Sequence, residues 1–427
     1  MCYAEQTRTV WGEVRIFKQN FAVLNDKGGS ILNKIKVGFF GVRRGLTYIR
    51  VLNQMEDVEI TAILDQNDKT VETAKRELPK DVKRVFSYEE LLDSGIDAVI
   101  LCNYFPEHAK YAAEALRKNI SVFSECTPAA TLSECVMLTE AAENSKAVYL
   151  LAENYPYYRG CRELKRVYET GMLGRVIFAE GEYVHPLSPG ESEKFIPDSS
   201  HWRANNPKTY YSTHSITPLI AATGLKPRKV IGKIAAMPDP FGKGLADGAG
   251  IMLVEMEGGA LFRISGSCSF GAHGNWYRLG CEKGGIETLR GSDDKVRLVV
   301  NDWDLTEETR RYASECEYLP EQTEEGRRAA ACGHGGSDWY ICRHFLDVLH
   351  GTEEPFLSVY DACAISAVGI LGWRSVLEDS KQLTIPDFSK KEERDLVRND
   401  DLNPFTVDGK EASLPHRYYG PVEESAE

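Results

Sequence analysis

A histidine and two tyrosines stand close together in the segment Tyr-Tyr-Ser-Thr-His at 210–214. Histidine is the side chain best suited to accept a proton near neutral pH, and a neighbouring phenol can relay that proton or hold a developing alkoxide. These residue types suit the oxidation of an alcohol, in which the hydroxyl proton leaves as the hydride departs. We therefore take His214, Tyr211 and Tyr210 as catalytic candidates. The alternative is that His214 is a core histidine that caps a helix over 215–223, beside a serine and a threonine that compete as caps.

Alcohol oxidation needs a hydride acceptor, and residues 34–65 predict the unit that would bind one. An apolar run over 34–41 ends in glycine, a helical pattern follows, and a second apolar run over 58–65 ends in an aspartate. This order predicts a strand, a tight glycine turn, a helix and a second strand. A carboxylate roughly 20 residues after the turn is suited to accept hydrogen bonds from the adenosine ribose.

The predicted NAD contacts in this unit are Gly41, Arg43, Arg44, Gly45 and Asp65. The turn departs from the usual dinucleotide fingerprint, because Arg43 occupies the place of the second glycine and the loop is one residue shorter. Taken singly, an ordinary strand-to-helix turn and a solvated strand end would explain these residues equally well. Their order and spacing favour a nucleotide site, and Asp65 favours NAD over NADP.

Two further strands are predicted over 98–103 and 120–125, with a helix over 109–119 between them. Open α/β sheets bind ligands at the carboxyl ends of their strands. Polar or conformationally restricted residues follow both strands, and we add four of them to the cofactor-binding set: Asn103, Pro106, His108 and Glu125. We give His108 a positioning role only, because a histidine there is more often a helix-start residue than a catalyst.

Taken together and in order, these segments resemble the Gfo/Idh/MocA family of sugar-handling oxidoreductases over residues 34–380. The segments that carry the resemblance are Asn103-x-x-Pro106-x-His108, 119–125, Glu153-Asn154-Tyr155, 171–176, 180–185, and His214 with Gly224. The resemblance implies that Asn154, Tyr183 and His185 contact the cofactor and that Tyr155 contacts the substrate. Trp202 and Arg203 are suited to stack on a sugar and hydrogen-bond it, although they could equally anchor a loop.

Two departures from the family pattern bear on the reaction. The usual Glu-Lys-Pro reads Glu125-Cys126-Thr127, so the lysine assigned to catalysis is absent, and Tyr210 replaces an aspartate. A lysine-lacking subset of the family, the NAD-dependent glycosidases that include enzymes acting on N-acetylgalactosaminides, carries a Tyr-x-Thr-His segment. Residues 211–214 resemble that segment, and residues 333–338 resemble another stretch of the same subset.

The resemblance implies an NAD-dependent enzyme that acts on carbohydrates. We expect it to oxidise a ring hydroxyl of a glycoside, at carbon 3, with transient NADH. The resulting ketone acidifies the proton on carbon 2, so that the aglycone can be eliminated and the glycoside is cleaved without net redox change. Two alternatives stay open: a plain NAD-dependent sugar dehydrogenase, and a non-catalytic sugar or nucleotide sensor on the same fold.

The pattern changes after residue 153 to alternating runs that predict an antiparallel sheet, at 175–185, 229–236, 250–257, 260–269 and 285–289. We therefore predict an α/β Rossmann domain with a parallel sheet, followed by an α+β domain with a large, mostly antiparallel open sheet. The predicted organisation is an N-terminal extension (1–33), an NAD-binding domain (34–152), a substrate-binding domain (153–380) and a C-terminal tail (381–427). The charge-rich stretch 305–331 reads as a solvated excursion, and helices are expected over 337–349 and 359–377.

Composition limits the partners. A net charge of −13 and a pI near 5.4 argue against nucleic acid and anionic membranes, and no apolar run is long enough to span a bilayer. The 11 cysteines show no CxxC spacing and the nine histidines do not cluster, so we expect free thiols, a reducing compartment and no metal site. We expect a cytoplasmic protein that takes a small sugar or glycoside and, as the resemblance implies, forms a homo-oligomer through its open sheet.

Overall fold

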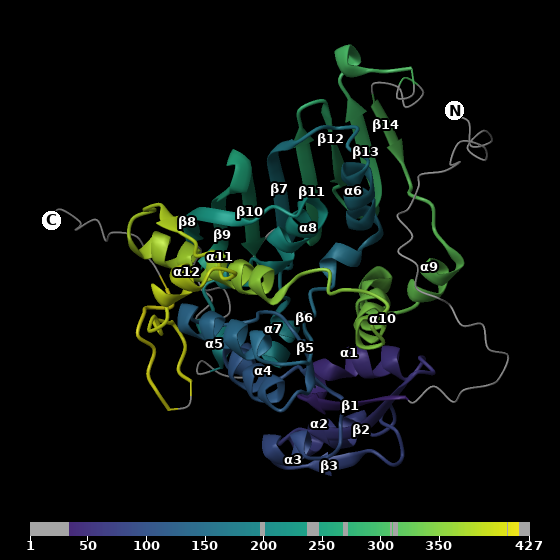
Figure 1. The fold of residues 1–427 in the computed structure, drawn as a ribbon, viewed down its shortest axis with the longest axis vertical. Helices are drawn as coiled ribbons and strands as arrows, with labels where there is room; N and C mark the ends of the chain where they lie inside the picture. The colour runs from purple at the N-terminus through teal and green to yellow at the C-terminus, as the bar shows by residue number, and fades with distance from the viewer. Residues whose placement is uncertain are drawn as a thin grey trace. The chain divides into compact units, whose positions relative to one another are not determined.

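The computed structural model describes residues 34–196, 201–236, 247–267, 272–307, 310, 315–407 and 409–417. The predicted N-terminal extension lies outside these residues. Two sheets carry the fold, a parallel one from the first part of the chain and a larger one from the second (Figure 1). Among the described residues, none of the helices combines the length and apolar character that crossing a bilayer requires.

The first sheet has six parallel strands in the order β3-β2-β1-β4-β5-β6, which confirms the predicted Rossmann architecture. Its strands are β1 (Ile35–Phe40), β2 (Val58–Leu64), β3 (Lys83–Val85), β4 (Ala98–Leu101), β5 (Ser121–Ser124) and β6 (Tyr149–Leu151). The helices between them are α1 (Val42–Leu52), α2 (Asp68–Ala74), α3 (Tyr88–Leu92), α4 (His108–Arg117) and α5 (Leu132–Glu143). The strand order reverses between β1 and β4, so a ligand site is expected at their carboxyl ends.

Local sequence explains these elements. The residues of β4 and β5 are buried throughout, as expected for strands covered by helices on both faces. Helix α5 begins with a capping box, in which Thr131 accepts from the backbone of Glu134 and the Glu134 side chain returns to the backbone of Thr131. Asn67 and Ser87 cap α2 and α3 in the simpler way, with one side-chain acceptor each.

The second sheet has nine strands in the order β14-β13-β12-β11-β7-β10-β9-β8-β15. They are β7 (Val176–Val184), β8 (Pro227–Ala236), β9 (Asp247–Met256), β10 (Leu261–Ser267), β11 (Gly274–Cys281), β12 (Gly284–Leu289), β13 (Ser292–Val300), β14 (Glu315–Tyr318) and β15 (Leu383–Thr384). All neighbours are antiparallel except β7 and β10, so the expected mostly antiparallel sheet is confirmed.

The charge-rich stretch 305–331 differs from its prediction as a plain solvated excursion. It contains the edge strand β14, paired with β13, and the short helix α9 (Glu324–Ala329), which Thr323 caps. Exposed residues alternate with half-buried ones along β14. A charged edge strand of this kind resists pairing with a further strand, which explains why its composition resembled that of a loop.

One face of the large sheet is covered by helices α6 (Arg159–Glu169), α8 (Thr213–Thr223) and α11 (Val359–Leu377). From the sheet, α10 (Ser337–Leu349) returns to the Rossmann domain and packs against α1 (Figure 1). The bounds of α10 and α11 are those predicted. The remaining helices are α7 (Pro189–Phe195) and α12 (Lys391–Asp395).

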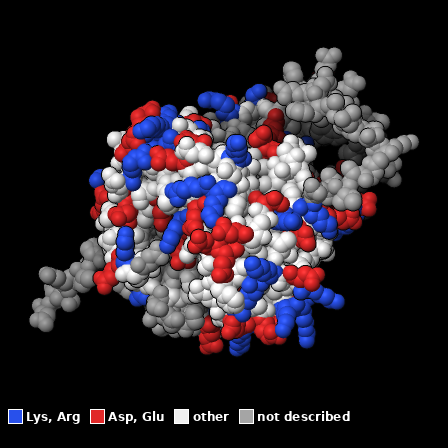
Figure 2. Space-filling model, turned by 60° about the horizontal axis from the view of Figure 1, so that its bottom comes forward, with Lys and Arg blue, Asp and Glu red and all other residues white. Residues whose placement is uncertain are grey.

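The residues after 381 contact both the large sheet and the Rossmann domain. Strand β15 extends the large sheet beside β8, whereas Arg394 and Arg398 form ion pairs with Glu143 and Glu140 on α5 of the Rossmann domain. In the view of Figure 2, basic and acidic side chains are interspersed and no broad field of one sign is seen.

Candidate active site

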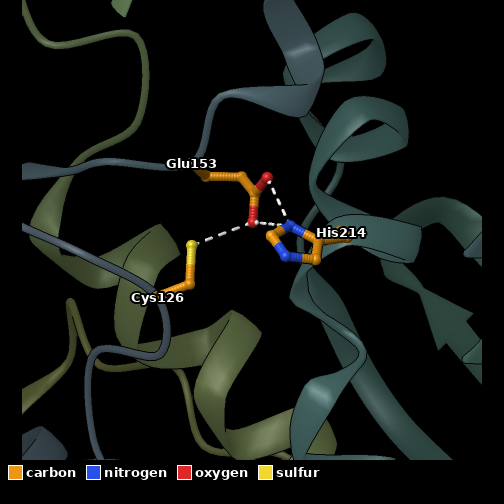
Figure 3. A group of neighbouring side chains, drawn as sticks. All are labelled: Cys126, Glu153 and His214. Atoms are coloured by element: carbon orange, nitrogen blue, oxygen red, sulfur yellow. Dashed lines mark hydrogen bonds and ion pairs between the residues drawn. The ribbon is translucent and has the colours of Figure 1, made fainter. Parts of the chain in front are cut away.

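The centre of the candidate site is a hydrogen-bonded group formed by Cys126, Glu153 and His214 (Figure 3). Glu153 lies 2.8 and 2.9 Å, through its two carboxylate oxygens, from Nδ1 of His214. Cys126 donates its thiol hydrogen to Oε2 of the same carboxylate, with Sγ 3.1 Å away. Cys126 and Glu153 follow β5 and β6, and His214 is the second residue of α8. The group therefore lies at the carboxyl ends of two parallel strands, where such sheets bind ligands.

Glu153 determines which nitrogen of His214 can act as a base. A carboxylate at Nδ1 holds the imidazole proton on that nitrogen, so Nε2 carries the lone pair. The carboxylate is itself fixed, because it is fully buried and also accepts from the backbone N–H of Tyr155 at 3.2 Å. The catalytic set predicted from sequence omitted Glu153, although a carboxylate directly after a short buried strand was a usable signal.

Three phenols surround the His214 ring and form what we call the aromatic cage: Tyr155, Tyr183 and Tyr211. Tyr155 stacks on the imidazole at 4.3 Å between ring centroids, and the rings of Tyr183 and Tyr211 lie 4.7 and 5.1 Å away. Burial raises the pKa of Tyr155 well above its usual value. The phenol of Tyr155 therefore stays neutral and can donate a hydrogen bond at physiological pH.

Tyr183 is linked to a second histidine. Its hydroxyl lies 3.1 Å from Nδ1 of His185, whose ring meets that of His273 at 4.8 Å. Burial, and then the charge of His273, lower the pKa of His185. A neutral His185 can accept a hydrogen bond from the hydroxyl of Tyr183, so two residues predicted to contact the cofactor are linked to each other beside His214.

Helix α8 holds His214 in place through two local features. In a regular helix the carbonyl of His214 would accept from residue 218, but Pro218 has no N–H, and the Tyr277 hydroxyl donates to that carbonyl instead at 2.7 Å. Gly181 on β7 lets the helix approach the sheet, because a Cβ there would lie 1.9 Å from the carbonyl oxygen of Ser215.

Cys126 takes the place of the family's lysine and serves as a hydrogen-bond donor. Burial, followed by the charge of Glu153, raises the pKa of this thiol well above its usual value. A protonated, buried thiol is no nucleophile. The ligand atoms of Cys126, Glu153 and His214 lie within 4.8 Å of one another, so these residues could hold a metal ion only after the thiol and imidazole protons had left.

The turn between β1 and α1 fits a dinucleotide. Gly41 has a φ of 92°, and a Cβ there would lie 2.5 Å from the backbone carbonyl of Cys102. Gly45 packs α1 on the sheet, because a Cβ there would lie 2.9 Å from the ring of Phe39. At the end of β4, the buried Oδ1 of Asn103 has no hydrogen-bond partner in the described part of the chain. A helix N-terminus with an unsatisfied acceptor nearby suits a pyrophosphate and its ribose.

Asp65, Arg43 and Arg44 are each held by contacts within the protein. Asp65 accepts at 2.9 Å from the backbone N–H of Val42 and of Asn67, which ties the end of β2 to the turn and leaves carboxylate lone pairs for a ribose. Arg44 pairs with Glu125 at 2.5 Å. Burial alone would raise the pKa of Glu125, but the charge and hydrogen bond of Arg44 lower it. Arg43 donates to the carbonyl of Lys194 near the end of α7.

His108 and Pro106, two residues predicted to bind the cofactor, hold backbone segments in place. His108 is buried, and its ring nitrogens lie 3.1 and 3.2 Å from the carbonyl oxygens of Thr127 and Asn103. Burial lowers the pKa of His108, so the ring is neutral and its single N–H can donate to either carbonyl oxygen. His108 therefore links the segments that carry Asn103 and Thr127. Pro106 lies in the first turn of a buried 3₁₀ segment that leads into α4.

Other predicted residues contact different parts of the fold. Tyr210 is corrected from a catalytic candidate to a core residue, because its ring packs on Phe405 and its buried hydroxyl donates to the carbonyl of Ala130. Asn154 donates to Asp338 at the start of α10. Trp202 packs against Phe105 after β4, with the Arg203 guanidinium 4.3 Å from the Trp202 ring.

Comparison with known proteins relates the first part of the chain to a family of oxidoreductases. Residues 35–153 match the family model of the oxidoreductase family with an NAD-binding Rossmann fold, GFO_IDH_MocA. The fold is also that of an oxidoreductase from Agrobacterium radiobacter solved with NAD+, L-tartaric acid and magnesium, with a TM-score of 0.67, 14% identity, and coverage of 84% of this chain and 99% of that one. A levoglucosan dehydrogenase solved with NADH and levoglucosan gives a TM-score of 0.68 at 14% identity, covering 83% and 100%.

Residues 35–153 thus resemble the NAD-binding domain of the Gfo/Idh/MocA oxidoreductases, and the protein is an NAD-dependent enzyme. Residues 297–394 match the C-terminal domain of glycosyl hydrolase 109. A glycosyl hydrolase family 109 protein of Shewanella sp. (strain W3-18-1) is 23% identical over 397 residues, covering 84% of this chain and 86% of that protein. Another, from Shewanella sp. (strain ANA-3), is 24% identical over 394 residues, covering 83% and 85%.

Proposed function

We propose that this enzyme oxidises a ring hydroxyl of a glycoside, at carbon 3, and thereby cleaves the glycosidic bond. The observation that carries the proposal is the Glu153–His214 pair inside the aromatic cage. The pair lies at the carboxyl edge of the parallel sheet, the edge that also carries the turn between β1 and α1. When bound, NAD would supply the hydride acceptor for this oxidation and the hydride donor for its reversal. Gly41, Asp65 and Asn103 are the residues that would hold it.

The residues of the site then have distinct roles. Nε2 of His214 takes the hydroxyl proton, and the buried carboxylate of Glu153 stabilises the imidazolium that results. Tyr211, the tyrosine of the Tyr-x-Thr-His segment, donates a hydrogen bond to the oxygen. The ketone acidifies carbon 2, whose proton passes through the Tyr183 hydroxyl to the neutral His185. Trp202 and Arg203 form a rim that contacts the sugar or its substituent.

The lost lysine supports cleavage over simple dehydrogenation. Cys126 stands in its place and donates to Glu153, so the proton transfer at the carbinol depends on His214. The C-terminal match to glycosyl hydrolase 109 and the full-length similarity to proteins of that name agree with this proposal. A simple sugar dehydrogenase is the second candidate, which the shared fold of a levoglucosan dehydrogenase favours.

The deciding experiment supplies nitrophenyl α- and β-glycosides, including N-acetylgalactosaminides, to the purified protein in D2O. We expect nitrophenol release without net accumulation of NADH, and solvent deuterium at carbon 2 of the sugar product. NADH formation in step with substrate loss and without release would establish the dehydrogenase. Release without deuterium at carbon 2 would exclude the elimination route.

We also propose that two copies associate through the open face of the large sheet. Ile251 and Leu253 on β9 and Leu261 on β10 are each about two-fifths exposed, although they lie within regular strands. Alternate residues of the same strands, such as Met252 and Phe262, are buried under the covering helices. An apolar patch on an otherwise open sheet suits a self-complementary interface. We place the protein in the cytoplasm.

A further inference from the structure

Asn275 is a buried polar residue on the face of the large sheet that carries the candidate site. Tyr277, two residues further along β11, points to α8 and donates to the carbonyl of His214. Side chains two positions apart on a strand lie on the same face, so the Asn275 amide also faces the covering helices. In the register of the two strands Asn275 is directly opposite Tyr183 of β7, and residues so paired have their Cβ atoms about 5 Å apart. Asn275 is therefore a direct neighbour of the aromatic cage.

The carbonyl group of this amide lacks a partner. Asn275 is 6% exposed, and its Oδ1 accepts no hydrogen bond from any residue that the structure describes. A buried acceptor without a donor carries a desolvation cost, so its presence beside a ligand site indicates a donor on the ligand. The chain is exposed at His273, two residues earlier, and buried at Asn275. The amide thus lies at the edge of the buried region, where a bound molecule can reach it.

The two strands that flank β7 place different groups beside Tyr183. On β10 the partner is Gly266, where a Cβ would lie 3.4 Å from the carbonyl oxygen of Tyr211, so the backbone of that turn occupies this side. On β11 the partner is Asn275. Of these two neighbours in the sheet, Asn275 is the one with a side chain that can contact a group bound at the Tyr183 hydroxyl. An asparagine is shorter than a tyrosine, so that group must point from the hydroxyl towards the sheet.

We propose that Asn275 is a specificity-determining residue whose Oδ1 accepts a hydrogen bond from the O–H or N–H group on carbon 2 of the substrate sugar. This inference rests on the proposed function, in which the proton of carbon 2 passes through the Tyr183 hydroxyl to His185. The hydrogen and the substituent are bonded to the same carbon. A sugar that presents the hydrogen to Tyr183 therefore places the substituent beside the Tyr183 ring, where the Asn275 amide lies.

This contact selects among sugars by the group on carbon 2. A hydroxyl and an acetamido group each carry a hydrogen-bond donor, whereas a 2-deoxy sugar carries none and leaves Oδ1 of Asn275 unpaired. A site built to bond a substrate donor rejects the analogue that lacks it, because the buried acceptor is then left without a partner. The enzyme should therefore discriminate against 2-deoxy sugars, and the discrimination should depend on Asn275.

The test uses three nitrophenyl glycosides that differ only at carbon 2, which carries a hydroxyl, an acetamido group or a second hydrogen. Asn275→Leu keeps the approximate size of the side chain and removes the acceptor. We expect kcat/KM for the better of the first two substrates to fall by about 10- to 100-fold, and that for the 2-deoxy glycoside to change by less than about threefold. Comparing the ratio of the two values between variant and wild type cancels the different intrinsic reactivities of the substrates.

Two controls separate recognition from folding. Because the Asn275 amide is unpartnered, Asn275→Leu should unfold in urea at a midpoint no lower than that of the wild type, and Asn275→Ala, which removes the same acceptor without adding bulk, should lose the same preference. Asn301→Leu is the matched control on the same sheet. Asn301 follows β13 and its amide donates to Asp304 at 3.1 Å, so this variant should keep the wild-type ratio.

Each outcome separates the proposals. An equal loss for all three substrates would mean that Asn275 acts through the fold or the cofactor, and it would overturn the inference. A ratio unchanged by Asn275→Leu and Asn275→Ala would overturn it as well, while leaving the proposed function intact. The wild-type enzyme is measured first, because failure to release nitrophenol from any glycoside would refute the proposed function itself, and the inference with it.

Discussion

At the scale of single residues, the role proposed for His214 depends on its buried neighbour Glu153. Glu153 accepts three side-chain or backbone hydrogen bonds, from His214, Cys126 and Tyr155, without any exposure to water. A buried carboxylate in this position fixes both the tautomer and the orientation of the imidazole. The reactivity of the histidine and the geometry of the strand end are thus coupled.

Glu153→Gln tests this coupling. The amide keeps the shape of the carboxylate but carries no charge, so it should no longer stabilise the imidazolium of His214. We expect kcat for the oxidation step to fall by about 10²- to 10⁴-fold with little change in KM, measured by the pre-steady-state rise in NADH absorbance. Cys126→Ser keeps a donor to Glu153 and serves as the control, with a change of less than about tenfold. Similar losses in both variants would contradict the assignment.

The sequence predicted some residues of this site correctly and could not predict others. Tyr210 and Tyr211 are adjacent, and only the 3₁₀ turn over Lys208–Tyr211 decides that Tyr211 meets His214 while Tyr210 enters the core. Irregular segments have no fixed side-chain period, so the pattern could not separate the two phenols. Tyr277 was out of reach altogether, because its role arises from Pro218, 59 residues earlier and across a sheet.

At the scale of elements, the position of α8 on the large sheet depends on the lack of a side chain at one residue of β7. A Cβ at Gly181 would lie 1.9 Å from the carbonyl oxygen of Ser215, the residue after His214. We expect Gly181→Ala to displace α8, to destabilise the fold by about 1–3 kcal/mol or more, and to lower kcat as well. Urea unfolding and steady-state kinetics check these effects.

A control for this substitution is available in the same sheet. Gly274 on β11 has no atom within 4 Å of an added Cβ, so Gly274→Ala should leave unfolding and kcat close to those of the wild type. If both alanine variants behaved alike, close packing of α8 at Gly181 would not be the cause.

Helix α10, which carries Asp338 at its start, is anchored further along by Asp57. Arg343 donates to both oxygens of Asp57 at 2.9 and 2.7 Å, and His350 lies 2.9 Å away. The Arg343 hydrogen bonds, against the effect of burial, lower the pKa of Asp57 from 3.8 to about 2. A carboxyl group with a lower pKa in the folded state than in the unfolded state stabilises the fold when the pH is above its pKa in the unfolded state. This stabilisation is lost as the pH falls through its pKa in the folded state.

Asp57→Asn should therefore cost stability at pH 7, by about 1 kcal/mol, with a smaller cost as pH falls from about 4 towards 2. Tryptophan fluorescence, to which Trp339 on α10 contributes, reports the urea unfolding at each pH. Asp93→Asn removes an exposed ion pair with Lys118 and is the control, which should unfold as the wild type does at every pH because solvent screens that pair. A cost that is independent of pH would show that the Asp57 charge does not anchor α10.

Elements with a long apolar signal were predicted, and the others were not. Continuous apolar runs marked β4 and β5, and long apolar stretches marked α10 and α11. Strands β3, β6 and β15 were missed because they have three residues or fewer. Strands β11, β13 and β14 were missed because charged residues on their outer face, such as Arg278 and Arg297, make their composition resemble that of loops. Those charges pair with Glu180 and Glu287 across the sheet, a long-range compensation that no local window contains.

At the scale of the whole molecule, the candidate site is built from both sheets. His214 and Tyr183 come from the large sheet and its helix, whereas Cys126 and Glu153 follow strands of the Rossmann sheet. The residues after 381 join the two, since Arg394 and Arg398 bind α5 while β15 extends the large sheet. The geometry of the catalytic group therefore depends on how the two halves are held together.

The open face of the large sheet gives the final prediction. Leu253 lies on this face beside Ile251 and close to the Arg263–Glu180–Arg278 ion pairs, so a second copy can match both apolar and charged groups by symmetry. Leu253→Lys places a charge in the centre of that patch. We expect light scattering to show the mass falling from a multiple of 47.8 kDa to that of one chain. Leu396→Lys, at an exposed leucine outside the sheet, should leave the assembly intact, and an unchanged mass for Leu253→Lys would exclude this face as the interface.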